Sequence, residues 1–280
     1  MKHEWNKTIP ILAWLLFATI LGFWVAPQET SARESLGFEP LTYIIVIMAM
    51  ILAGAILWSQ LIKHAKPEHI DIAFAVGIGL VMSRVAMLLA PQIFFEGTTA
   101  TMMAARLVTM GGFAYVYWKI TKAMQKSWKN AIKYTQASNL LVVTAITVSA
   151  ALIGADMPAW VAITILALAS IYDAVAVWKT KSMIGLAKFF IGRRMLPGIA
   201  VPYKRPVGKF AILGGGDVFF LVLVSASFHA TNTTLMYASA AGMFASIVFL
   251  FMISKKDTFY PALPFMLAGA LIGIGVGWLL

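Results

Sequence analysis

Two aspartates, Asp173 and Asp217, each lie inside a long apolar segment of this 280-residue chain. The other acidic residues fall in polar connections or at the ends of apolar segments. An ionisable side chain within hydrocarbon is costly, so a residue of this kind marks a functional site by default. Two carboxyls that meet in a poorly hydrated site share a proton and hold a general acid and a general base together. Such a pair can activate water to hydrolyse a peptide bond, without a metal or a covalent intermediate.

The spacing of the two aspartates places them at similar depths. Asp173 precedes Lys179 by six residues and Asp217 follows Lys209 by eight, which corresponds to about 9 and 12 Å along a helix. Both distances start from the same polar connection, so we expect the carboxyls to lie nearly level on adjacent, antiparallel helices. The spacing leaves three alternatives: a dyad that shares a proton, a proton relay, or a separate ion pair of each aspartate with an arginine.

The composition indicates that lipid surrounds these segments. Apolar residues make up 61% of the chain and charged residues 12%, against roughly 45–50% and 25% in soluble domains. The absence of cysteine excludes a disulfide framework, a thiol nucleophile and a Cys-ligated metal. No HExxH zinc motif, GxSG serine-protease motif or Walker A phosphate loop is present. The sequence therefore predicts no metal site and no cofactor.

The apolar segments predict an all-α integral membrane protein. A bilayer core of about 30 Å needs about 20 apolar residues in a helix, and long apolar runs must be helical to satisfy their backbone in lipid. Nine segments meet this criterion: 8–26, 41–62, 71–90, 99–118, 135–154, 158–178, 211–229, 232–253 and 262–280. In the last, Gly269, Gly273 and Gly277 form a small-residue stripe that predicts packing against the bundle or against a second copy of the chain.

The basic residues indicate how these spans are oriented. Nineteen of the 22 Lys and Arg residues lie in the N-terminus and the even-numbered connections. Arg33 is the one basic residue in the odd-numbered connections and the C-terminus, and Arg84 and Arg106 lie inside spans. This asymmetry predicts a cytoplasmic N-terminus and an external C-terminus. The net charge of +11 is therefore explained by membrane topology, and no nucleic-acid partner is expected.

The predicted organisation has three parts: spans one to six in 1–178, a cytoplasmic connection in 179–210, and spans seven to nine in 211–280. Within the connection, the sequence KSMIGLAKFFIGRRML (181–196) predicts a helix on the anionic inner leaflet. The sequence PGIAVPYKRPVG (197–208) contains three prolines and predicts an irregular or extended segment. We also expect the extended stretch 209–213 to pair with an unwound substrate as an added strand.

Three short motifs bear on the function. They are YD at Tyr172–Asp173, GGGD at Gly214–Asp217 and PALP at Pro261–Pro264. In order and topology they resemble the YD, GxGD and PALP motifs of the presenilin and signal-peptide-peptidase family of intramembrane aspartyl proteases. The resemblance covers the whole chain in span count. The cytoplasmic N-terminus is similar to that of presenilin, whereas signal-peptide peptidases are inverted. The inner connection is shorter than one that holds a long autoinhibitory segment.

The resemblance implies a presenilin-like bundle of nine transmembrane helices, in which Asp173 and Asp217 share the general acid and base roles. It also implies a set of residues that shape the site: Tyr172, Gly214, Gly215, Gly216, Pro261, Ala262, Leu263 and Pro264. Glycines before Asp217 let a substrate backbone approach and let the helix start late. Prolines in the third motif leave carbonyls without intrahelical donors.

The expected partners are transmembrane-helix substrates and the lipid bilayer, with a second copy of the chain as a further candidate. The principal alternative function is proton-coupled transport, because carriers also use membrane aspartates and interrupted helices. A proteolytically silent scaffold is the third alternative.

Overall fold

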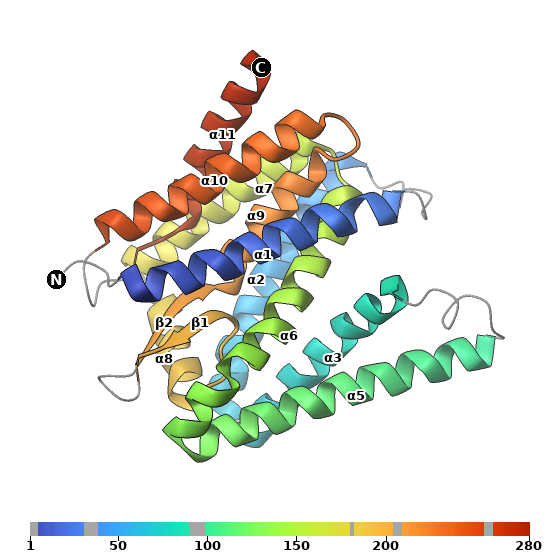
Figure 1. Cartoon of the computed structure of the whole chain (residues 1–280), viewed down its shortest axis with the longest axis vertical. Coiled ribbons are helices and arrows are strands. Elements are labelled where there is room, and N and C mark those ends of the chain that lie inside the picture. Colours follow the sequence, from blue (N-terminus) through green and yellow to red (C-terminus); the bar gives the residue numbers. More distant parts are fainter. Residues whose placement is uncertain (1–4, 31–38, 90–98, 180–181, 204–208, 255–259) are drawn as a thin grey trace.

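The computed structural model describes residues 5–30, 39–89, 99–179, 182–203, 209–254 and 260–280. Most of these residues are helical (Figure 1). The elements are α1 (Trp5–Thr30), α2 (Pro40–His64), α3 (Pro67–Leu89), α5 (Thr99–Lys126), α6 (Trp128–Ala155), α7 (Ala159–Ala174), the π-helix η1 (Val175–Lys179), α8 (Ser182–Arg193), β1 (Gly198–Pro202), β2 (Phe210–Gly214), α9 (Gly215–Ser227), α10 (Thr233–Ile253) and α11 (Leu263–Leu279).

The helices are those of a multi-pass membrane protein. Each predicted span overlaps a helix in the described part of the chain. Five segments are long and apolar enough to cross a membrane by length and composition: Thr8–Ala26, Pro67–Leu88, Trp128–Ala155, Ala159–Lys179 and Thr233–Ile253. Shorter apolar helices are Leu41–Gly54, Gly215–Ser227 and Leu263–Leu279. The number of nine transmembrane spans therefore stays a prediction.

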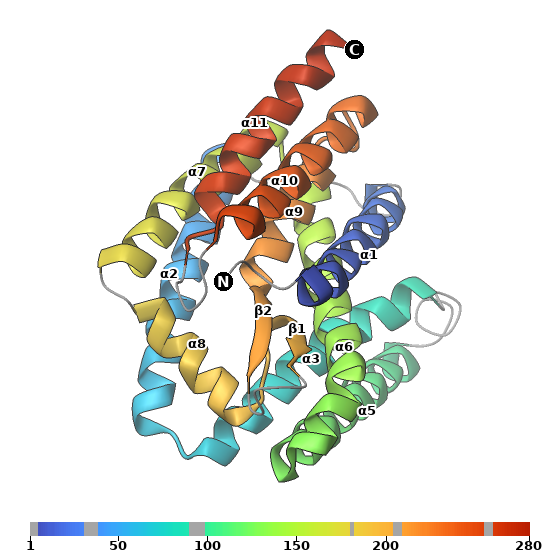
Figure 2. The same cartoon turned by 60° about the vertical axis from the view of Figure 1, so that its left-hand side comes forward.

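Helix α9 lies at the centre of the bundle. It contacts α1, α6, α7, α10, α11 and both strands, and Figures 1 and 2 show these elements on its different sides. Its sequence from Val218 to Ser227 is apolar or small throughout, and almost every residue in it is buried. A helix without a polar face is expected in such a position, because none of its sides needs contact with water. The bundle thus holds Asp217, in the first turn of α9, between several helices.

Small residues bring α10 and α11 close together. A Cβ atom on Gly269 would lie 2.3 Å from the carbonyl oxygen of Gly242, and one on Gly273 would lie 2.1 Å from that of Ala238. Backbones approach this closely in membrane helices only where side chains are small. Within this chain, the small-residue stripe of α11 therefore packs on α10.

The connection between α7 and α9 contains a helix and a hairpin. The predicted helix in 181–196 is confirmed as α8. The predicted extended segment forms β1, which pairs antiparallel with β2 so that Gly198 lies opposite Gly214 and Pro202 opposite Phe210. Residues 204–208 lie outside the described residues.

The helix of the predicted seventh span begins later than residue 211, and most of the expected extended stretch 209–213 lies in strand β2. Residues 211–214 complete strand β2, and the helix begins at Gly215. Pairing with β1 satisfies the inward backbone groups of Ala211 and Leu213, and three successive glycines have low helix propensity.

Candidate active site

Asp173 lies in the last turn of α7 and faces the start of α11. Its Oδ2 accepts a hydrogen bond of 3.2 Å from the backbone N–H of Leu263, the first residue of α11. The backbone N–H of Ala262 also stabilises the carboxylate. The first N–H groups of a helix have no partner within it, and the helix dipole favours a negative charge at this end. The PALP segment therefore contributes donors to Asp173.

Two prolines frame this helix start. Pro261 is buried just before it, and Pro264 lies in the first turn of α11. A proline in the first turn costs no hydrogen bond, because its missing N–H would have no partner in the helix. The sequence predicted unpaired carbonyls at this motif, whereas the contact that the structure shows is a backbone donor to the carboxylate of Asp173.

Asp217 occupies a similar position at the start of another helix. It is the third residue of α9, and its Oδ2 accepts a hydrogen bond of 3.2 Å from the backbone N–H of Gly214. Both aspartates therefore lie at helix N-termini, Asp217 inside the first turn of α9 and Asp173 in front of α11. This end of a helix suits a carboxylate in a poorly hydrated site.

The structure brings the two aspartates together. The residues belong to different helices, yet they lie near enough for the charge of Asp173 to act on Asp217. Both residues are partly buried. Within the described residues, neither carboxyl forms an ion pair with a Lys or Arg, and Arg84 and Arg106 are exposed. Among the three alternatives that the spacing left, this geometry disfavours separate ion pairs and fits a dyad or a relay.

The three glycines before Asp217 have different surroundings. A Cβ atom on Gly215 would lie 2.6 Å from the carbonyl oxygen of Pro197, which accepts the N–H of Gly215 at 2.9 Å. A Cβ atom on Gly214 would lie 3.1 Å from Oδ2 of Asp217, and one on Gly216 would meet no atom within 4 Å. Close packing against Pro197 therefore explains why residue 215 has no side chain, and the nearby carboxylate of Asp217 explains the same at residue 214. Nothing among the residues that the structure describes explains why residue 216 is a glycine.

Tyr172 precedes Asp173 and is half-buried. Its hydroxyl makes no hydrogen bond to another residue in the described ranges, so the structure does not connect it to either carboxyl. Two residues after Asp173, at Val175, the α-helix α7 gives way to the π-helix η1. Short π segments in α-helices often accompany functional sites.

The hairpin of β1 and β2 precedes Asp217, and the outer edge of β1 is hydrogen-bonded to a side chain of α6. The side chain of Asn139, on α6, donates to the carbonyl of Ala200 at 2.8 Å and accepts its N–H at 3.1 Å. The backbone of Ala200 in β1 therefore points away from β2. Residues in an antiparallel pair alternate in direction, so the backbone of Ile212, opposite Ala200, points away from β1.

In the part of the chain that the structure describes, the outer edge of β2 carries backbone groups without hydrogen-bond partners. Within the described residues, nothing bonds to the backbone N–H or C=O of Ile212. Two residues further on, the N–H of Gly214 points the same way and bonds to Asp217. The free edge of the hairpin therefore runs directly to this carboxyl.

Sequence reasoning missed Asn139. The signal available was an amide side chain inside a predicted span, but its partner lies 61 residues away. No group of three or more His, Asp or Glu side chains placed to hold a metal is found among the residues that the structure describes.

Comparisons with known proteins show similarity in structure. No family model and no curated protein matches the sequence. Two solved structures match over nearly the whole chain, and both are described as a presenilin family intramembrane aspartate protease. The first, in space group C222, has a TM-score of 0.63 and 19% identity and covers 97% of this chain and 98% of its own. The second, in space group P2, has a TM-score of 0.62 and 19% identity over 96% of both chains. At this identity the likeness concerns the fold: the chain has the presenilin-like fold of these structures.

Proposed function

We propose that this protein is an intramembrane aspartyl endopeptidase that cleaves transmembrane segments of other membrane proteins. The observation that carries the proposal is the placement of Asp173 and Asp217 on different helices, near enough for one charge to act on the other, with each carboxyl at a helix N-terminus. The fold supports it, because the two solved structures of this fold are described as intramembrane aspartate proteases.

The proposed reaction uses water and one shared proton. The ionised carboxyl of the pair takes a proton from water, whose oxygen attacks the carbonyl carbon of the scissile bond. The protonated carboxyl donates its proton to the carbonyl oxygen, which gives a tetrahedral diol. When the diol collapses, the C–N bond breaks and a proton passes to the leaving nitrogen. The products are a new carboxyl end and a new amine end, and the pair regains one proton.

The free edge of β2 would present the substrate to the pair. A transmembrane helix shields its carbonyls, so the substrate must unwind before water can attack. An unwound segment can pair with the outward N–H and C=O of Ile212 as an added strand. Because the same edge ends at Gly214 and Asp217, the paired segment would extend toward the catalytic carboxyls.

Replacing Ile212 tests this role of the edge. In Ile212→Pro the outward N–H is lost, while the inward bonds of Ala211 and Leu213 to β1 remain. Loss of one such hydrogen bond lowers turnover by about tenfold at most. The control Ile212→Ala keeps the N–H and removes the side chain. Unchanged turnover by a folded Ile212→Pro protein would contradict strand addition.

Cleavage itself is tested with purified protein in lipid vesicles and a panel of single-span substrates, with product masses measured. We expect cuts inside the span. The same vesicles, loaded with a pH-sensitive dye, test the rival function. Proton flux that depends on Asp173 and Asp217, without any cleavage, would favour a proton-coupled transporter.

The proposal includes an orientation and partners. We place the N-terminus in the cytoplasm and the C-terminus outside, as the distribution of basic residues predicts. This orientation favours a presenilin-type protease over the signal-peptide-peptidase type, which is inverted. The substrates are transmembrane helices, no nucleic acid is involved, and a homo-oligomer is a further proposed assembly.

A further inference from the structure

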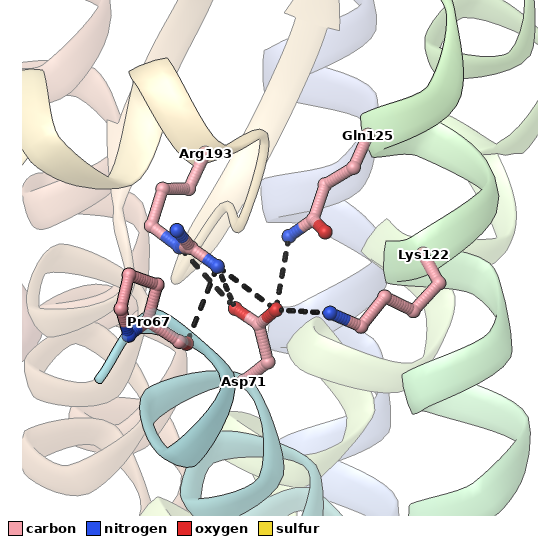
Figure 3. A network of polar contacts seen from close by, with 5 residues as sticks. All are labelled: Pro67, Asp71, Lys122, Gln125 and Arg193. Atoms are coloured by element: carbon pink, nitrogen blue, oxygen red, sulfur yellow. Dashed lines mark hydrogen bonds and ion pairs between the residues drawn. The ribbon is translucent and has the colours of Figure 1, made fainter.

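A buried carboxylate that is not part of the proposed dyad lies at the start of α3. The side chain of Asp71 has no solvent exposure, and Figure 3 shows the groups around it. Nη2 of Arg193 donates to both carboxylate oxygens at 2.9 Å, and Nζ of Lys122 donates to Oδ2 at 2.9 Å. Nε2 of Gln125 adds a bond of 3.3 Å, and Nη2 of Arg193 also bonds to the carbonyl of Pro67 at 3.2 Å.

This Asp71 network joins three helices. Asp71 belongs to α3, Lys122 and Gln125 to the last turns of α5, and Arg193 is the last residue of α8. A buried ion pair is weak support for stability, because the cost of desolvation offsets much of the attraction. It does require one geometry, since a bidentate arginine must approach a carboxylate in its plane. The network therefore specifies where α8 ends.

The next residue strengthens this attachment. Arg194 has a positive φ of 56°, a region that residues other than glycine seldom occupy. Its Nη1 donates to the carbonyls of Met124 and Gln125 at the end of α5. Its guanidinium also lies over the ring of Trp128, 5.8 Å from the centroid. Both arginines thus fix the end of α8 on the α3–α5 pair.

A short path of three residues and one backbone hydrogen bond leads from Arg194 to Gly215, near Asp217. Met195 and Leu196 are fully buried in neighbouring apolar clusters. The carbonyl of Pro197 then accepts the N–H of Gly215, two residues before Asp217. Strand β1 begins at Gly198 and holds β2 in register. A displacement of the end of α8 would therefore pass along the chain to the hairpin and to the start of α9.

We propose that Asp71 and Arg193 are positioning residues that hold the hairpin and Asp217 in register for catalysis. They touch neither substrate nor the reacting atoms, so they are not catalytic residues. The inference rests on the proposed proteolytic function for its kinetic consequence. Its structural consequence, the placement of α8, can be measured without any substrate.

The test uses Asp71→Asn, which keeps the shape and removes the charge. Glu68→Gln is the matched control, because Glu68 is an exposed acid in the first turn of the same helix. The chain has no cysteine, so spin labels at Lys188→Cys on α8 and Thr234→Cys on α10 are unique; both positions are exposed. We expect one narrow distance distribution in the parent and the control, and a shifted or broadened distribution in Asp71→Asn.

Steady-state kinetics distinguish a loss of positioning from a loss of folded protein. A misplacement of about 1 Å can cost about 100-fold in rate, so we expect Asp71→Asn to lower kcat by this order while KM changes little. Rates are normalised to the folded fraction. Asp71→Glu restores the charge and should recover part of kcat. If Asp71→Asn keeps both the narrow distribution and the kcat of the control, the proposal is wrong.

The two proposals fail in distinguishable ways. If the parent protein cleaves no substrate, the proteolytic function fails, and the distance measurement still decides whether the network places α8. If the parent cleaves and Asp71→Asn loses rate only in proportion to its folded fraction, the positioning role fails while proteolysis stands.

Discussion

Gly215 and Gly216 are neighbours at the start of α9, yet the same substitution should affect them in opposite directions. In Gly215→Ala the new methyl group would lie 2.6 Å from the carbonyl oxygen of Pro197 and 2.7 Å from Cδ1 of Ile146. The carbonyl belongs to a backbone that also accepts the N–H of Gly215, so it has little freedom to move. Overpacking of this kind costs about 1–3 kcal/mol.

Gly216→Ala meets no atom within 4 Å of the new methyl group. Alanine also favours the helix over glycine, and it restricts the unfolded chain, so this variant should gain about 0.5 kcal/mol. The structure therefore predicts a difference of about 1.5–3.5 kcal/mol between two variants that differ only in the position of one methyl group.

Thermal unfolding in one detergent, followed by tryptophan fluorescence, measures this difference. At about 2–4 °C per kcal/mol, the apparent Tm of Gly215→Ala should lie roughly 3–14 °C below that of Gly216→Ala. The unsubstituted chain should lie between them. Equal Tm values, or a lower Tm for Gly216→Ala, would refute the packing that we describe around the start of α9.

Three other substitutions test separate contacts. Gly214→Ala should displace the carboxylate of Asp217 by a few tenths of an ångström, because the new Cβ would lie 3.1 Å from Oδ2; steady-state kinetics should show a lower kcat with a nearly unchanged Tm. Asn139→Leu removes both hydrogen bonds to the backbone of Ala200, which should lower the free energy of unfolding by about 2–4 kcal/mol in a denaturant titration. Gly242→Ala would place a methyl group 2.1 Å from a backbone oxygen of α11 and should cost about 1–3 kcal/mol. Gly275→Ala, with open space around it inside the same helix, should instead gain about 0.5 kcal/mol in the same titration.

Much of the fold follows from hydropathy. Long apolar runs predicted the positions of the helices, because a continuous apolar stretch in lipid must satisfy its backbone internally. Hydropathy placed residues 211–213 in the seventh span, although the Pro-rich lead-in already predicted the extended stretch that forms β2. Its residues 210–213 are apolar and run into an apolar helix, and periodicity cannot separate a short buried strand from the first turn of a helix. Only the pairing with β1 distinguishes them.

Candidate site residues can be found from the sequence where a charged side chain lies within an apolar segment. Asp173 and Asp217 stood out because a carboxyl in an apolar span is expensive. Asp71 did not, because it lies at the edge of a span, where an acid is unremarkable. Its burial depends on Arg193, which is 122 residues away in the chain. Contacts of this range come from the packing of helices and leave no local pattern in the sequence.

The central claim is that Asp173 and Asp217 together activate water to cut a peptide bond inside a transmembrane segment. The most direct measurement is cleavage of one single-span substrate in ¹⁸O-labelled water, with wild type beside Asp173→Asn and Asp217→Asn and the products analysed by mass spectrometry. Asparagine keeps an oxygen that can accept the N–H of Leu263 or Gly214 but cannot exchange a proton. We predict products cut within the span, one heavy oxygen in the new carboxyl end, and a loss of more than about 100-fold in rate in each variant. Cleavage that persists in either variant, or wild-type products without the heavy oxygen, would contradict the mechanism.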